Sequence, residues 1–133
     1  MRIRQLIARW WPTALVVAVI LYATLDSDPV GVDSFPLIPH LDKLIHAIMF
    51  GGLFASISFD SRRAGHRLST KSLLTFAAIS IAAGAIDEVL QHTIANGRDG
   101  DILDWAADSF GIAVAYFTAP PVINNIFKHK HTL

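Results

Sequence analysis

The stretch LLTFAAISIAAGAI, from Leu73 to Ile86, contains no charged residue and ends directly at Asp87 and Glu88. A surface helix of a soluble bundle needs a polar stripe that repeats every 3.6 residues along its whole length, and this stretch lacks one. Residues 15–25, 47–59 and 109–119 are equally free of charge. With its flanks, each stretch approaches the roughly 20 residues with which a helix crosses a hydrocarbon core about 30 Å thick. The sequence therefore predicts an integral membrane protein rather than a soluble four-helix bundle.

The predicted fold is all-α, a single domain over residues 1–133 with four transmembrane helices at about 6–25, 41–59, 72–93 and 101–119. Pro12 falls near the first turn of the first helix, where a missing N–H costs little. Pro120 and Pro121 are expected to end the fourth helix. The first segment, preceded by arginines, is also typical of a secretory signal peptide, but no clear small-x-small cleavage site follows it. We therefore expect an uncleaved helix.

Composition narrows the function classes. Hydrophobic residues make up 53% of the chain, which exceeds the usual share in globular domains. The absence of cysteine excludes disulfides and thiolate metal sites. Because 11 basic residues balance 11 acidic ones, no overall field points to nucleic acid, and we expect no nucleic-acid partner.

The distribution of lysine and arginine predicts the topology, because these residues accumulate on the cytoplasmic side of a membrane. The linker from Asp26 to His40 contains neither residue, and the linker between the third and fourth segments contains only Arg98. We therefore expect these two linkers outside and both termini in the cytoplasm. Apart from Lys43 in the second segment, the other basic residues lie before or at the start of the first segment, between the second and third, or after the fourth: Arg2, Arg4, Arg9, Arg62, Arg63, Arg67, Lys71, Lys128 and Lys130.

That topology places the ionisable residues within the helices at one membrane face, the outer one. At a rise of 1.5 Å per residue, His46 lies about 6 Å below Asp42, and Asp108 lies about 10 Å below Asp101. Helical spacing also puts the aspartates of the fourth helix on one face. We therefore expect four residues to meet at one level: His46, Glu88, Asp104 and Asp108.

Some polar positions have a simpler interpretation. Asp42 and Asp101 either belong to the ligand-binding site or simply cap helix N-termini, where a carboxylate accepts from free N–H groups. Asp87 is interpreted as solvated, and Gly111 as a residue that permits close helix packing. His46, by contrast, is one of three ionisable residues deep enough to need a partner or a water-filled cavity; the other two are Glu88 and Asp108.

Charge at the expected site is strongly negative. Either some carboxylates hold a proton, as clustered acids in a low dielectric do, or a divalent cation occupies the cavity. Oxygen ligands with one imidazole suit Mg²⁺, Mn²⁺ or Zn²⁺. The expected site contains two basic side chains, Lys43 and Arg98, and five acidic ones: Asp42, Glu88, Asp101, Asp104 and Asp108.

Three segments of this region resemble the VanZ-like family in order and spacing: DKLIHAIMFGGL (42–53), DEVLQ (87–91) and GRDGDILDWAADSFG (97–111). The resemblance rests on the combination of D-K-x-x-H, E-x-x-Q and R-x5-D-x3-[ND]-x2-G, and it covers about half the chain. Many relatives have asparagine where this chain has Asp108, and Ala115 stands where a second glycine is usual. The motif positions fall on Asp42, Lys43, His46, Glu88, Gln91, Arg98, Asp104, Asp108 and Gly111.

The family is named for a small membrane protein associated with resistance to the lipid-bearing glycopeptide teicoplanin. The resemblance implies a multi-pass protein of a bacterial inner membrane with a cell-envelope function. We therefore expect an outward cavity that binds an envelope amphiphile, either a lipid intermediate or a lipoglycopeptide-type ligand. Arg98 and Lys43 would contact its anionic group, Gln91 would orient it, and the acids with His46 would hold a cation.

Two other functions stay open. A structural scaffold needs the polar residues only to link the helices. A metal-assisted hydrolase or transferase uses metal-bound water as the nucleophile, and covalent catalysis is less favoured because no serine or cysteine is placed like a nucleophile. The residues of such an enzyme, as metal ligands or general base, would be His46, Glu88, Asp104 and Asp108.

Overall fold

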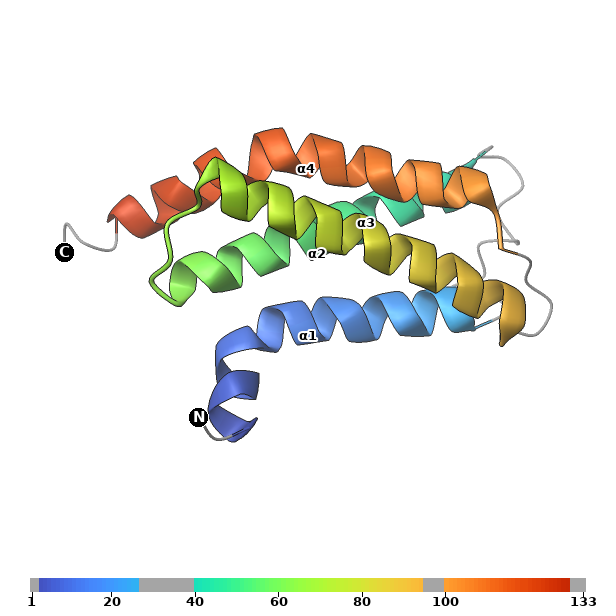
Figure 1. Ribbon diagram of the computed structural model, residues 1–133, viewed down its shortest axis with the longest axis horizontal. Helices are drawn as coiled ribbons and strands as arrows, with labels where there is room; N and C mark the ends of the chain where they lie inside the picture. The colour runs from blue at the N-terminus through green and yellow to red at the C-terminus, as the bar shows by residue number, and fades with distance from the viewer. Residues whose placement is uncertain (1–2, 27–39, 95–99, 130–133) are drawn as a thin grey trace.

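The computed structural model describes residues 3–26, 40–94 and 100–129, and every regular element in these ranges is an α-helix (Figure 1). All four helices are long and apolar enough to cross a membrane. The prediction of an all-helical chain with four such segments is therefore confirmed, while the side on which each terminus lies stays a prediction. The helices are α1 (Ile3–Leu25), α2 (Leu41–Arg63), α3 (Thr70–Thr93) and α4 (Ile102–His129).

The two ends of the bundle differ in charge. Figure 1 shows the start of α1, the α2–α3 connection and the end of α4 at one end, which we call the basic end because Arg9, Arg62 and Arg67 lie there. The starts of α2 and α4 lie at the other end with the end of α3 (Figure 1). We call this the acidic end, since it carries Asp42 and Asp101. The segregation expected from the sequence is thus present in the fold.

The centre of the bundle is a close crossing of α2 and α4. A Cβ added to Gly111 would overlap the backbone carbonyl of Ala47, and one added to Gly51 would lie 2.9 Å from the carbonyl oxygen of Gly111. Small residues at such crossings let membrane helices pack backbone to backbone. The expected packing role of Gly111 is confirmed. Beside the crossing lie the fully buried side chains of Phe50, Phe54 and Ile112.

Large apolar side chains cover the outside of the bundle. Ile48 on α2, Val89 on α3 and Phe117 on α4 are each more than 60% exposed. A soluble monomer rarely exposes contiguous apolar surface on this scale, whereas lipid tails cover it in a bilayer. The surface agrees with a multi-pass membrane protein.

Helix α1 is attached to α2 through a buried aspartate that sequence reasoning missed. Asp60 is fully buried, and its Oδ2 accepts from the backbone N–H and the hydroxyl of Thr13 at 3.0 and 2.7 Å. Trp10 leaves helical geometry, so the first turns of α1 bend away (Figure 1). This bend frees the carbonyl of Arg9, which accepts from Arg63. The second helix therefore continues to Arg63 instead of ending near residue 59, because α1 covers the aspartate that follows.

Helix α4 does not end at Pro120 and Pro121, and the predicted end at residue 119 is wrong. A proline removes one backbone donor, but membrane helices tolerate it where neighbouring packing holds the helix. That packing is present, because Ile123 is buried and the ring of Phe127 lies 5.6 Å from that of Phe59. Tertiary contacts thus carry α4 on to His129.

Candidate functional site

A chain of polar contacts joins α2 to α4 at the acidic end. The Nζ of Lys43 donates to Asp104 Oδ1 at 3.0 Å, and the other oxygen of Asp104 lies 3.7 Å from His46 Nε2. His46 Nδ1 lies 2.9 Å from Asp108 Oδ1. A proton is shared in this hydrogen bond between the imidazole and the carboxyl group. Both partners are buried, with 3% of His46 and none of Asp108 exposed, so the pair lies inside the bundle.

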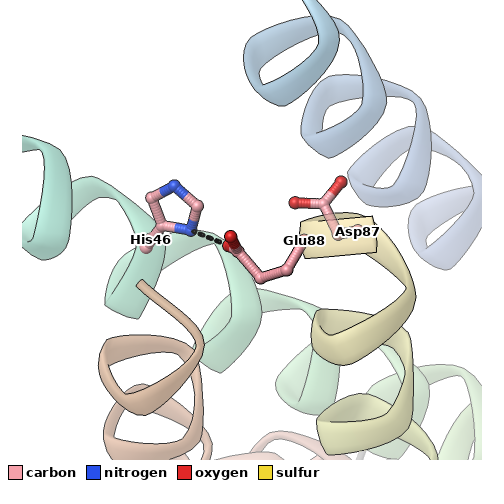
Figure 2. A group of neighbouring side chains, drawn as sticks. All are labelled: His46, Asp87 and Glu88. Atoms are coloured by element: carbon pink, nitrogen blue, oxygen red, sulfur yellow. Dashed lines mark ion pairs between the residues drawn. The ribbon is translucent and has the colours of Figure 1, made fainter. Parts of the chain in front are cut away.

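Glu88 connects the end of α3 to this chain. Its Oε1 lies 4.0 Å from His46 Nδ1, which Figure 2 marks as an ion pair. Its Oε2 accepts from the backbone N–H of Asp101 at 2.8 Å, immediately before α4 begins. Glu88 therefore holds the start of α4 against α3 as well as facing the histidine. The structure brings together all four residues that were expected to meet: His46, Glu88, Asp104 and Asp108.

The two predicted helix caps have different outcomes. Asp101 accepts from the N–H of Leu103 at 2.8 Å, which confirms the cap, and this hydrogen bond holds the pKa of Asp101 below its ordinary value. Asp42 does not cap, because α2 begins one residue after His40 and has no side-chain cap there. Asp42 instead lies 3.2 Å from the Nζ of Lys43, in the first turn where the helix dipole favours a carboxylate.

A second polar layer faces α1, and it corrects two expectations. Asp87 is 3% exposed rather than solvated, and it accepts from the hydroxyl of Thr24 at 2.7 Å. Gln91 turns away from His46, since its Nε2 donates to the carbonyl of Thr24 at 3.0 Å. Asp87 and Gln91 are spaced i and i+4 and so share one face of α3. This spacing was the sequence signal that could have indicated a second polar contact face. Thr24 gave none, because one threonine in an apolar run is common.

Buried oxygens at this site lack a hydrogen-bond donor within the described ranges. They are Asp108 Oδ2 and Glu88 Oε1. A Cβ added to Gly84 would lie only 3.0 Å from Asp108 Oδ2, so this glycine makes room for the carboxylate. Buried oxygens normally have a partner in proteins or in bound water. Two such oxygens in one cluster point to an additional proton or cation.

The residues of the site are suited to hold a cation. Ligand atoms of His46, Asp87 and Glu88 all lie within 4.8 Å of one another, and Figure 2 shows Asp87 between the histidine–glutamate pair and α1. One imidazole with carboxylates suits Mg²⁺, Mn²⁺ or Zn²⁺. The predicted arginine, Arg98, lies outside the described residues. Within them, Lys43 and His46 face the acidic cluster, which consists of Asp42, Asp87, Glu88, Asp101, Asp104 and Asp108.

An apolar groove of about 450 Å³ runs between α3 and α4 next to the acidic cluster. Val89, Ile102 and Trp105 form part of its wall, and Glu88 and Asp101 lie at its polar edge. Trp105 is fixed by a hydrogen bond from its Nε1 to the carbonyl of Ile81 at 3.1 Å. The groove therefore places an apolar surface beside a half-buried carboxylate, Glu88, and a more exposed one, Asp101.

No family model, curated protein or solved structure matches the chain. The site is accordingly defined by its own contacts.

Proposed function

We propose that the chain is a VanZ-like multi-pass protein of a bacterial inner membrane that binds the polar head of a cell-envelope amphiphile at its acidic end. The amphiphile is a lipid-linked intermediate or a lipoglycopeptide-type ligand, which connects the protein to envelope function or glycopeptide resistance. The distribution of basic residues supports an acidic end that faces outward and termini that face the cytoplasm. The observation that carries the proposal is the apolar groove with the carboxylates of Glu88 and Asp101 at its edge.

The apolar groove and the acidic cluster would bind different parts of the ligand. Val89 and Trp105 offer an apolar wall for a lipid chain, while Glu88 and Asp101 lie where its polar head would enter. Lys43, expected to contact an anionic group, is already held by three aspartates. The surplus of carboxylates therefore favours a head with an amine, or a phosphate bridged by a divalent cation.

A binding measurement with two matched substitutions tests this proposal. A fluorescent polyprenyl pyrophosphate is titrated into the full chain in detergent with and without Mg²⁺. Val89→Trp fills the groove and is expected to weaken binding at least tenfold. Val114→Trp is the control, because Val114 is also exposed but does not line the groove. Equal binding by both variants would contradict the proposal, as would equal binding of the uncharged polyprenol.

A metal-dependent hydrolase or transferase is the second candidate, favoured by the convergence of His46, Asp87 and Glu88. These three residues would hold the ion, which supplies a water of lowered pKa. Asp104, whose Oδ2 lies 3.7 Å from the opposite ring nitrogen, Nε2, would orient the imidazole, as carboxylates behind ligating histidines commonly do.

Calorimetric titration of the purified chain with Mn²⁺ tests this candidate. Binding at one ion per chain, lost in Glu88→Gln and kept in Asp42→Asn, is the expected result. A chain that binds no Mn²⁺ or Zn²⁺ overturns it. If neither metal nor amphiphile binds, the polar layer is a scaffold that links the helices.

A further inference from the structure

The basic end contains a pocket of about 490 Å³ that the proposed function does not use. Three separate segments meet there: the end of α2, the connection that leads into α3, and the last turns of α4. They contribute Arg62, Arg67 and Lys128, one cation each, and no described residue lining the pocket is acidic. The other described residues of the lining are Leu68, Ser69 and Asn124.

Arg62 is held in place by an aromatic stack. Its guanidinium lies 5.4 Å from the centre of the Phe127 ring, which in turn packs on Phe59. A guanidinium placed over a ring is fixed in direction while its N–H donors stay available. Arg62 therefore presents a planar fork to the pocket with little conformational freedom left to lose.

The continuation of α4 past Pro120 and Pro121 completes the pocket. Asn124 and Lys128 lie one and two turns beyond the prolines, so a helix that ended at residue 119 would leave this wall out. On the opposite wall, Ser69 caps α3 by accepting from the N–H of Ser72 at 3.2 Å. The positive end of the α3 dipole thus lies at the pocket beside the side-chain cations.

We propose that this pocket binds a phosphate group, carried by an anionic lipid headgroup or by a free phosphate compound. Arginine forks match the oxygens of phosphate in pairs, and three cations without a lining carboxylate outweigh its charge. The pocket lies at the helix ends, where basic clusters between transmembrane helices receive lipid headgroups. The inference is independent of the amphiphile proposed for the acidic end, since the two sites share no residue.

The test is native mass spectrometry of the full chain from nanodiscs of phosphatidylcholine with a fifth of phosphatidylglycerol. Each lost cation near a membrane surface weakens anionic lipid binding about fivefold. Arg67→Gln should therefore reduce phosphatidylglycerol adducts about fivefold, and Arg62→Gln with Arg67→Gln about 25-fold. Lys71→Gln is the control, because Lys71 is exposed at the same end but does not line the pocket.

Unchanged adducts in Arg67→Gln and in the double variant would overturn the proposal. Far-UV circular dichroism shows whether the double variant folds, and Arg67→Gln tests the pocket without disturbing the aromatic stack. Inorganic phosphate distinguishes the two sources. Displacement of the lipid by phosphate supports a free phosphate compound, while retention of the lipid supports a headgroup; loss of binding in the variants is required for either.

Discussion

Alanine at Gly111 is expected to destabilise the bundle, because the added Cβ would overlap the backbone of Ala47. A backbone cannot rotate out of the way as a side chain does, so α2 and α4 must separate. Overpacking of this kind costs about 1–3 kcal/mol, whereas alanine in place of glycine within a helix gains roughly 0.5–1 kcal/mol. We therefore expect a net loss at Gly111, of up to about 2.5 kcal/mol in the free energy of unfolding.

The neighbouring glycines calibrate this loss. A Cβ on Gly51 would lie 2.9 Å from the Gly111 oxygen, half an ångström inside the 3.4 Å at which ordinary contact begins. A Cβ on Gly52 would meet nothing within 4 Å. Gly52→Ala should therefore stabilise the helix slightly, and Gly51→Ala should fall between the other two variants. The predicted order comes from contact distances alone, since helix propensity is the same for all three changes.

The assay is denaturation of each variant in maltoside micelles by increasing fractions of dodecyl sulfate, followed by far-UV circular dichroism. Gly111→Ala should unfold at the lowest fraction and Gly52→Ala at the highest. If Gly111→Ala unfolds at the same fraction of dodecyl sulfate as Gly52→Ala, or at a higher one, the backbone contact between α2 and α4 is wrong. The contact between His46 and Asp108 would then also lose its geometric basis, because the same crossing sets it.

Three further predictions concern the contacts of the acidic end. Thr24→Val removes the hydroxyl that donates to Asp87 and should cost about 1–3 kcal/mol, since a buried carboxylate loses a hydrogen bond. Trp105→Phe removes the donor to the Ile81 carbonyl and should cost about 0.5–1.5 kcal/mol; both costs are measured by the same denaturation. The lowered pKa of Asp101 contributes stability above the unfolded value near 3.9, which is lost as pH falls through the folded pKa. In Asp101→Ala, the free energy of unfolding should therefore fall less steeply below pH 4 than it does in the unmodified chain.

Each of these predictions has a direct control. Thr24→Ser keeps the hydroxyl and should be nearly neutral, and Thr118→Val removes an exposed hydroxyl that bonds only its own helix. Equal losses for Thr24→Val and Thr118→Val would contradict the buried contact. For Trp105, the control is Trp11→Phe at an exposed tryptophan. An equally large loss in the free energy of unfolding there would show that the ring rather than the Nε1 donor matters. For Asp101, an acid transition unchanged in the alanine variant would remove the capping argument.

The fold could be predicted from the sequence where a long apolar segment has no polar residues at helical spacing. Residues 73–86 illustrate this, because no arrangement of so uniform a segment leaves a water-facing side. What could not be predicted depended on a partner. Asp60 follows an apolar run and reads as the start of a loop until the bend at Trp10 brings Thr13 to it. Pro120 likewise reads as a helix end until the packing beyond it is known.

The residues of the candidate site could be predicted from the sequence as a group. Which of them face His46 and which face α1 could not be predicted. Glu88 and Asp87 are adjacent, and one helical step turns one toward His46 and the other toward α1. Their adjacency predicts that the two side chains point in different directions, but it does not indicate which direction has a partner. That choice depends on where α1 lies, and α1 has no charged residue after Arg9 until Asp26 to reveal its position.

The two threonine contacts of α1 have a consequence for how the protein is made. Helix α1 leaves the ribosome before α2 and α3, so Asp60 and Asp87, which accept hydrogen bonds from Thr13 and Thr24, are synthesised later. The hydroxyl of Thr24 lies 2.7 Å from the carbonyl of Ile20 in its own helix, so a solitary α1 can wait in the bilayer with that group satisfied. The two aspartates then bind α1 near its middle, at Thr13, and near its end, at Thr24. The contacts that fix the rotation of α1 therefore form only after α2 and α3 have been made.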